Sequence, residues 1–196
     1  MKLILASGSP RRAEILCKAG FALETLETRV DEARLPGEAP EAYVQRLAIA
    51  KAGAAVDDLL DTAEATFVIG ADTTVIVGSE MLEKPADAKD AQRMLRLLSG
   101  KWHEVLTGVS VIGLPEGQRA NFVDKTRVQL VELSEQEIQE YVATGEPFGK
   151  AGGYGIQGIA GRFVARIEGC YFSVMGLPLS RVWIALRSLG WRDAAL

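Results

Sequence analysis

The sequence predicts an α/β fold in which a mixed β-sheet is flanked by helices. Apolar strands and amphipathic helices follow one another, and several neighbouring strands are joined by turns short enough for hairpins, which argues against a purely parallel sheet. The chain has 196 residues, a length that favours one domain over 1–196, built as a single body or as two lobes around a cleft. Hydrophobic residues make up 48% and charged residues 24%, so the chain can bury a core and does not resemble a disordered one.

Each strand that we expect is a short apolar or alternating run bounded by turn residues. In chain order these runs cover 3–6, 66–70, 73–77, 102–112, 121–133, 163–167 and 170–174. Ala71 and Asp72 separate the second run from the third, so Asp72 is expected at the end of a strand. Gly78-Ser79 and Glu168-Gly169 are predicted to turn two hairpins.

Each helix that we expect has apolar residues three and four positions apart and a start or stop signal. The first begins at Pro10 with Ser9 as its cap, and the fourth follows a capping box of Ser134 and Glu137. The other three cover about 40–60, 87–98 and 178–189. Lys51 shares the apolar stripe of the second helix, and an inward-facing lysine there needs an explanation.

Charge and hydropathy exclude two kinds of partner. The net charge is -4 and no basic block occurs, which argues against binding to a nucleic-acid polymer. No apolar run approaches the roughly 18 residues of a membrane span, and the apolar run at 3–6 is too short for a signal-peptide core. We therefore expect a cytoplasmic protein without a membrane partner.

The cysteines and the single histidine limit the chemistry. Cys17 and Cys170 lie far apart without a Cys-x-x-Cys spacing, which supports neither a disulfide framework nor a zinc ribbon. His103 is the only histidine, so any metal must be a hard ion held by carboxylates and substrate oxygens. Since no Gly-x-Ser-x-Gly motif is present, His103 fits a packed or surface residue better than a hydrolase triad.

The segment Ser7-Gly8-Ser9-Pro10-Arg11-Arg12 is a candidate phosphate-binding unit. A glycine-containing turn that leads into a helix offers backbone N–H groups and the positive end of the helix dipole, and two arginines add bidentate donors. The segment is not a P-loop, because Gly-x-x-x-x-Gly-Lys-Ser/Thr is absent. An ordinary capped helix with two exposed arginines is the alternative.

Acidic and basic residues form a second candidate group. Asp72 lies between two apolar runs and would be costly to bury without a cation, a metal or a substrate. Asp31-Glu32 supplies further carboxylates in a loop. Together with Lys51, Lys84 and the arginine pair, these residues resemble the set needed for metal-assisted attack on a phosphate. A turn aspartate and a solvated Lys84 are the alternatives.

The glycine-dense segment 149–158 is the third candidate. Gly153, Gly155 and Gly158 fit Gly-x-Gly-x-x-Gly, but the segment follows a helix and leads to a predicted hairpin, so we reject a dinucleotide fingerprint. Such a loop brings backbone close to another group, and Gln157 could read a base edge through its amide. A tight structural crossover is the alternative.

Taken together, these motifs resemble the Maf family of nucleoside triphosphate pyrophosphatases over about residues 3–179. The resemblance implies an elongated mixed sheet of the Maf and inosine triphosphatase-like kind with two lobes around a central cleft. It also implies hydrolysis of a nucleoside triphosphate to the monophosphate and pyrophosphate with Mg²⁺ or Mn²⁺. The motifs that carry it are Leu5 to Arg12, Gly70-Ala71-Asp72-Thr73, Glu83-Lys84-Pro85, Ser99-Gly100 with Thr107-Gly108-Val109, and Gly153 to Gly158.

The resemblance also implies residue roles and a branch of the family. Asp72 would be the general base, and Glu32 with Asp72 would bind the metal. The residues implied to bind substrate are Ser7, Ser9, Arg11, Arg12, Lys51, Thr73, Lys84 and Gln157. Arg12, Thr73 and Gln157 match the branch that acts on dTTP and UTP, with standard or modified pyrimidine nucleotides as targets.

Two other functions remain open from the sequence. One is the 7-methyl-GTP pyrophosphatase activity of the same family, and the other is a nucleotide-binding regulator of septum formation without significant turnover. The sequence does not fix the oligomeric state, and a homodimer is one option.

Overall fold

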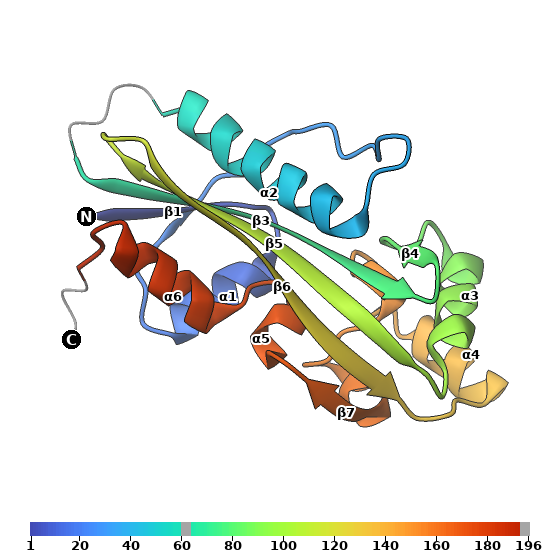
Figure 1. Ribbon diagram of the computed structural model, residues 1–196. Helices are drawn as coiled ribbons and strands as arrows, with labels where there is room; N and C mark the ends of the chain where they lie inside the picture. Colours follow the sequence, from blue (N-terminus) through green and yellow to red (C-terminus); the bar gives the residue numbers. More distant parts are fainter. Residues whose placement is uncertain (60–63, 193–196) are drawn as a thin grey trace. The chain divides into compact units, whose positions relative to one another are not determined.

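In the computed structural model, which describes residues 1–59 and 64–192, the chain forms a mixed sheet of seven strands flanked by helices (Figure 1). The strand order is β2-β1-β3-β5-β6-β7, and β4 also pairs with β3. β1 is parallel to β2 and β3, whereas the β3–β4 and β6–β7 pairs are antiparallel. The α/β class with a mixed sheet, predicted from the sequence, is therefore confirmed.

The strands are β1 Lys2–Ala6, β2 Glu24–Thr25, β3 Thr66–Val77, β4 Glu80–Leu82, β5 Trp102–Leu114, β6 Gln118–Leu130 and β7 Val164–Glu168. The helices are α1 Pro10–Lys18, α2 Pro40–Asp57, α3 Ala88–Leu98, α4 Glu135–Ala143, α5 Tyr171–Val174 and α6 Leu179–Ser188, with 3₁₀ helices η1 Ala151–Gly153 and η2 Ile159–Phe163. Within the described part of the chain, none of these helices is long and apolar enough to cross a membrane.

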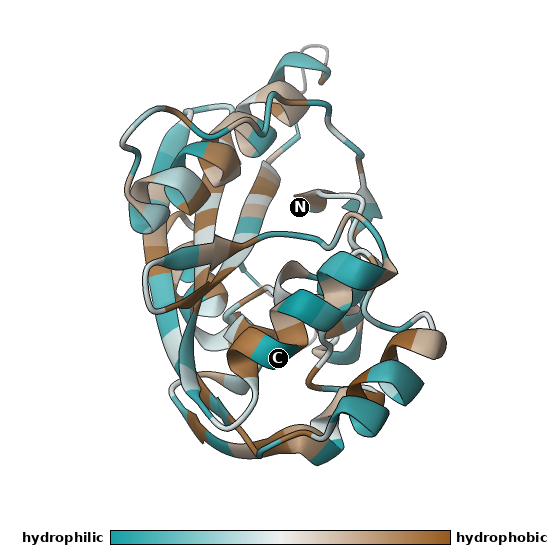
Figure 2. Cartoon of the chain, turned by 90° about the vertical axis from the view of Figure 1, so that its right-hand side faces the viewer, coloured by the Kyte–Doolittle hydropathy of each residue, from teal (hydrophilic) through white to brown (hydrophobic). Residues whose placement is uncertain are grey.

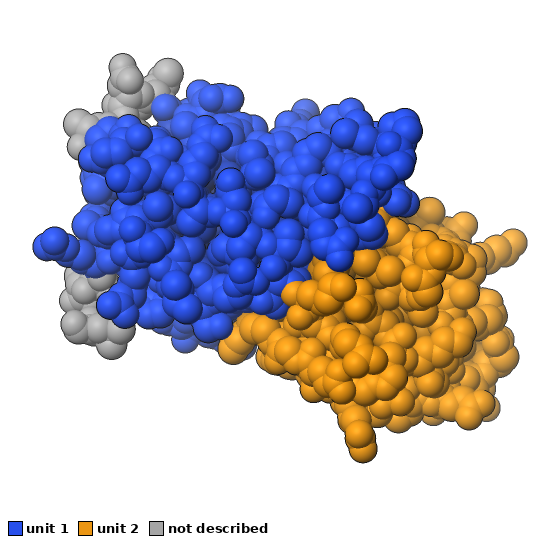
Figure 3. Space-filling view, in the orientation of Figure 1, with its two compact units in different colours: residues 1–72, 107–124, 176–196 blue, residues 73–106, 125–175 orange. Residues whose placement is uncertain are grey.

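The chain divides into two compact units (Figure 3). Unit 1 contains Met1–Asp72, Thr107–Asp124 and Gly176–Leu196, and unit 2 contains Thr73–Leu106 and Lys125–Met175. The single domain over 1–196 stays a prediction.

In unit 1 the alternation of side chains along β1 and β3 determines which of them pack against α2. Ile4 and Ala6 of β1 and Val68 of β3 share one apolar cluster with Ala52 and Ala55 of α2. Because successive strand residues point to opposite faces, Phe67 faces the other way, and its ring packs edge-on against Trp191. Figure 1 shows α2 on one side of these strands and α1 with α6 on the other.

Two glycines allow α2 to lie directly on the sheet. A Cβ at Gly70 of β3 would lie 2.3 Å from the Ala48 carbonyl oxygen, and a Cβ at Gly108 of β5 would lie 2.3 Å from the Val44 carbonyl oxygen. Real Cβ atoms do not come this close to backbone, so any larger residue would push the helix away. Glycine at 70 and 108 therefore sets the distance between α2 and the strands.

In unit 2 the core forms between strand ends and two short helices. α3 packs against α4 and η1, and its inward residues are Ala91, Met94, Leu95 and Leu98. The predicted capping box is confirmed, since the Ser134 Oγ accepts from the Glu137 N–H and the Glu137 carboxylate accepts from the Ser134 N–H. In Figure 2 the helices show hydrophilic and hydrophobic residues on different sides, as expected of helices packed on a sheet.

Two sequence predictions about secondary structure are wrong. β3 runs without interruption through Ala71 and Asp72, because the carboxylate that would break an apolar strand has a lysine partner. In the predicted hairpin strand 170–174, Tyr171–Val174 form α5 instead, with Cys170 as its N-cap. The Thr126 Oγ1 of β6 accepts from the Cys170 N–H and turns the chain away, while β7 pairs with β6. The predicted helix end at Leu60 lies outside the described residues, and α2 ends at Asp57.

A pair of glycine substitutions tests the contact between α2 and the sheet. We expect Gly70→Ala to lower the free energy of unfolding by about 1 to 3 kcal/mol, because the added methyl meets backbone atoms. Gly53→Ala in α2, where nothing lies within 4 Å of a Cβ, should instead raise it by up to about 1 kcal/mol through helix propensity. Urea denaturation of both variants measures the difference. Equal stability of Gly70→Ala and the parent would contradict the close approach.

Candidate functional site

The turn between β1 and α1 is organised around the hydroxyl of Ser7. The Ser7 Oγ accepts hydrogen bonds from the Ser9 N–H at 3.2 Å and from the Arg12 Nη1 at 3.0 Å. Ser9 occupies the predicted N-cap position, but its side chain makes no capping hydrogen bond. Because the Ser7 oxygen already accepts twice, its own O–H is directed elsewhere as a donor.

Arg12 is buried and held at a fixed place. Its Nε donates to the Gly176 carbonyl oxygen at 2.8 Å, in addition to the bond from its Nη1 to Ser7. Burial lowers the pKa of Arg12, while the charges of Asp72 and Glu32 raise it. The guanidinium therefore lies within electrostatic range of both carboxylates. Arg11, half-buried next to it, also has its pKa lowered by burial.

Lys51 joins the two predicted metal-binding carboxylates. Its Nζ lies 2.7 Å from the Asp72 Oδ1 and 2.6 Å from the Glu32 Oε1. The Lys51 and Asp72 side chains are 10% and 13% exposed, whereas the Glu32 side chain is 45% exposed. The inward lysine predicted on the stripe of α2 is thus explained by β3, where Asp72 continues the row of Val68 and Gly70 toward α2.

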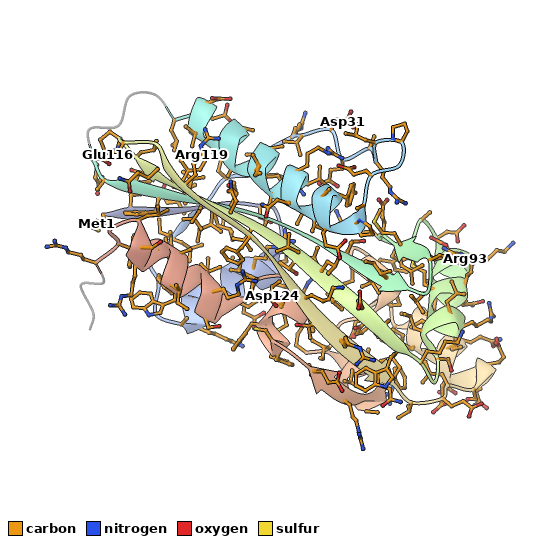
Figure 4. All side chains as sticks on the ribbon, in the orientation of Figure 1. Met1, Asp31, Arg93, Glu116, Arg119 and Asp124 are labelled. Atoms are coloured by element: carbon orange, nitrogen blue, oxygen red, sulfur yellow. The ribbon has the colours of Figure 1, made fainter. Side chains whose placement is uncertain are left out.

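The loop that carries Glu32 is fastened to α2. The Tyr43 hydroxyl donates to the Glu32 carbonyl oxygen at 3.1 Å. Arg46 makes a bidentate pair with the Glu38 carboxylate at 2.7 and 2.8 Å, and these hydrogen bonds lower the pKa of Glu38 to about 2. Asp31, in the same loop (Figure 4), closes a local turn by accepting from the Ala33 N–H.

The other predicted substrate-binding residues belong to unit 2. Thr73 is half-buried in β3 and, as the residue after Asp72, points to the opposite face of the strand. Lys84 is exposed just after β4, and Gln157 is exposed between η1 and η2. Unit 1 therefore brings together Arg12, Ser7, Lys51, Asp72 and Glu32, while Thr73, Lys84 and Gln157 are placed within their own unit.

His103 is a packed residue, as expected. It is 2% exposed, and its Nε2 lies 2.7 Å from the hydroxyl of Tyr154 in the glycine-dense segment. Burial lowers the pKa of His103 to about 4, so the ring is neutral at neutral pH. A neutral ring and a phenol in contact act as a structural hydrogen-bonded pair.

Several residues that shape the site were missed by sequence reasoning. Tyr43, Glu38 and Arg46 fix the Glu32 loop, and Glu146 contacts the segment of Gln157. Glu38 and Arg46 are eight positions apart, a spacing that no helical or strand rule connects. Glu146 stands between a helix and a glycine-dense loop, and an acidic residue at such a place is also typical of a solvated turn. The local sequence therefore did not indicate its contacts.

Comparisons with known proteins cover nearly the whole chain. The profile of the family described as Maf-like protein matches residues 2–189, a range that contains every candidate site residue. A solved structure of a nucleoside-triphosphatase / dITP/XTP pyrophosphatase from Mycobacterium abscessus matches 66% of this chain and 74% of its own, at 15% identity and a TM-score of 0.37.

Three curated relatives are similar over most of the chain, and each is called a dTTP/UTP pyrophosphatase. The protein of Hahella chejuensis is 48% identical over 98% of this chain and 96% of its own length. That of a Geobacillus strain is 48% identical over 97% and 99%. The protein of Vibrio cholerae is 52% identical over 91% and 92%.

Removing the charge of Lys51 tests whether the buried ion pair is obligatory. We expect Lys51→Met to lower the free energy of unfolding by about 3 kcal/mol, because Asp72 keeps its burial and loses its nearest cation. The double variant Lys51→Met with Asp72→Asn should recover most of this loss, since neither charge remains. Urea denaturation of the two single variants and the double variant gives the coupling. Additive losses would show that the two charges do not depend on each other.

Proposed function

The chain belongs to the Maf family, and on that premise we propose that it is a pyrophosphatase that hydrolyses dTTP and UTP to the monophosphate and pyrophosphate. The names of relatives about half identical over nearly the whole chain support this substrate class. Arg12, Thr73 and Gln157, which mark the dTTP/UTP branch, support the choice of branch.

One observation carries the proposal: an ammonium group contacts two carboxylates beside a buried arginine at the start of a helix. The Lys51 Nζ lies within 2.7 Å of Asp72 and within 2.6 Å of Glu32, and Arg12 is fixed in the same unit by Ser7 and Gly176. Attack on a phosphoanhydride needs oxygens for a metal, cations for the phosphates and a base for water. This group supplies all three kinds.

Each residue of unit 1 has a role that follows from its contacts. Asp72 acts as the general base, because an ionised carboxylate can accept a proton from water. Lys51 and Arg11 bind the triphosphate as cations, Ser7 donates its O–H to a phosphate oxygen, and Ser9 contributes from the turn at the helix start. Because the cations are held before substrate binds, little reorganisation is needed during the reaction.

A divalent cation fits the donor set. Mg²⁺ commonly binds one or two carboxylates and completes its coordination with water and phosphate oxygens, and Glu32 and Asp72 already share one cation, the Lys51 ammonium. Among residues 1–59 and 64–192, no three or more His, Cys, Asp and Glu side chains form a group that could hold a metal. Glu32 and Asp72 would hold Mg²⁺ or Mn²⁺ together with substrate oxygens. Bound there, the metal would neutralise phosphate charge and polarise water.

The residues of unit 2 are proposed to bind the rest of the substrate. Lys84 would add a further cation for the triphosphate. Thr73 and Gln157, with Arg12, would read the pyrimidine, because thymine and uracil present acceptor, donor and acceptor along one edge and an amide offers both a donor and an acceptor. Cytosine presents a different order, which leaves polar groups of such a site unpaired.

Two alternative functions, the cellular location and the oligomeric state belong with this proposal. A 7-methyl-GTP pyrophosphatase would share the catalytic residues and differ in the residues that bind the base. A regulator of septum formation would bind nucleotide without turnover. A cytoplasmic location agrees with the two free cysteines. A homodimer stays a prediction.

Neutralising Asp72 tests its role as the base. We expect Asp72→Asn to lower kcat by about 10² or more, because an amide keeps the shape of the carboxylate and cannot take the proton. The control is Asp57→Asn, the same change at an exposed position of α2, which should leave kcat within about twofold of the parent. Pyrophosphate release and circular dichroism of both variants are the measurements. A folded Asp72→Asn protein with parental turnover would remove Asp72 from this role.

A panel of nucleoside triphosphates tests the substrate class. We expect dTTP and UTP to be hydrolysed with a kcat/KM at least about tenfold above CTP, ATP, GTP and 7-methyl-GTP, since one unpaired polar group costs about 1 to 3 kcal/mol. EDTA should abolish pyrophosphate release and excess Mg²⁺ should restore it. Comparable turnover of dTTP and 7-methyl-GTP would overturn the branch, and binding without any pyrophosphate release would favour the regulator.

A further inference from the structure

Gln157 lies in a closed turn whose conformation depends on its neighbours. The Gly158 N–H donates to the Gly155 carbonyl oxygen at 3.0 Å, which closes the turn Gly155–Gly158 around the exposed Gln157. A glycine-dense segment is conformationally permissive by itself. The backbone from which the Gln157 side chain projects is therefore held by the groups at the two ends of this turn.

The carboxylate of Glu146 holds the end that follows Gln157. Its Oε2 accepts from the Ile159 N–H at 2.8 Å, and its Oε1 accepts from the Ala160 N–H at 3.2 Å and from the Tyr141 hydroxyl at 3.0 Å. The two N–H groups begin η2, where a helix has no internal partners for them. One side chain thus fixes the backbone that comes directly after the turn.

The electrostatics of Glu146 agree with this geometry. Burial raises the pKa of Glu146, but the hydrogen bonds from Ile159, Ala160 and Tyr141 outweigh it, and the pKa lies below its ordinary value. Glu146 is therefore ionised at neutral pH and acts only as an acceptor. An amide in its place would turn a donor toward at least one of the three N–H and O–H groups.

The turn is also packed against the Glu146 segment. A Cβ at Gly158 would lie 2.5 Å from the Glu146 Oε2, and a Cβ at Gly155 would lie 2.9 Å from the Lys150 Cε. The Lys150 Nζ donates to the Glu146 carbonyl oxygen. Glycine at 155 and 158 therefore lets the backbone of the turn lie close to the side chains of Lys150 and Glu146.

The end that precedes Gln157 is held by a separate contact. Tyr154 is 6% exposed, its hydroxyl lies 2.7 Å from the His103 Nε2, and the two rings pack edge-to-face with centroids 5.4 Å apart. Since β5 carries His103, this end is fixed to the sheet. Loss of the Glu146 contacts would therefore loosen only the end of the turn that follows Gln157.

We propose that Glu146 is a positioning residue that holds the turn of Gln157 and thereby sets the selectivity of the site for one base over another. The proposal rests on the proposed function, in which Gln157 reads the pyrimidine. A pair of hydrogen bonds to a base edge requires the amide to be held within about half an ångström. A looser turn weakens discrimination between bases, while the phosphate chemistry of Asp72 and Lys51 in unit 1 continues.

The test compares Glu146→Gln with Glu140→Gln. Glu140 is exposed on α4 and accepts a local hydrogen bond from Gln136, so its substitution removes the same charge away from the turn. For Glu146→Gln we expect the ratio of kcat/KM for dTTP to that for CTP to fall about tenfold, mainly through the KM for dTTP, with kcat within about threefold. Glu140→Gln should change neither quantity.

Hydrogen–deuterium exchange of the peptide that covers 155–160 provides a readout independent of activity. Glu146→Gln should raise the exchange of the Ile159 and Ala160 amides at least about tenfold, and Glu140→Gln should not. If Glu146→Gln does not fold, Tyr141→Phe removes one of the three donors and should move both readouts about threefold in the same direction.

The outcomes separate this inference from the function on which it rests. Unchanged exchange at 159 and 160 overturns the positioning role whatever the activity. Raised exchange with an unchanged dTTP to CTP ratio, or an equal loss of kcat on every nucleotide, overturns the link to base selectivity. A parent protein that does not prefer dTTP to CTP overturns the proposed substrate and this link together, and the exchange data then still decide whether Glu146 holds the turn.

Discussion

The candidate site depends on how closely α2 lies against β3 and β5. The missing side chains at Gly70 and Gly108 let backbone of the helix contact backbone of the strands, and Lys51, one turn beyond Ala48 in α2, then reaches the Asp72 carboxylate at 2.7 Å. Both groups are nearly buried, so each would be costly without the other. The same contact that packs the core of unit 1 thus fixes the distance between a cation and an acid.

Glu32 reaches the same ammonium by a different route, through a loop that has no strand or helix of its own. The loop is tied down by Tyr43 and by the bidentate pair of Arg46 with Glu38. Because the pKa of Glu38 is lowered to about 2, this pair contributes stability above the unfolded pKa of about 4.3 and loses it as the pH falls toward 2. The loop that carries Glu32 is therefore held by this ion pair at neutral pH.

Local patterns predicted most of the fold because β1, α1, α3 and the capping box of α4 each follow from a short run of residues. The helical pattern also showed that Lys51 lies on the apolar stripe of α2, where a charged residue is unusual. Predictions failed where a distant partner contributes. Asp72 continues a strand next to Lys51, which balances its charge, and Tyr171–Val174 form a helix after Cys170, whose N–H donates to Thr126. Glu146 was missed for the same reason, since its two backbone donors lie 13 and 14 positions away.

Four glycines near the candidate site residues act by allowing close contact. In the segment that follows α4, the sequence alone suggests a permissive loop, yet Gly158 lies against a carboxylate and Gly155 against a lysine stem. Gly70 and Gly108 do the same for a helix. A flexible loop would lose entropy each time it ordered around a ligand, whereas a loop already held by Glu146 and Tyr154 has that cost built into folding. For this reason the dense glycines around Gln157 are better understood as the condition for a rigid turn than as a source of motion.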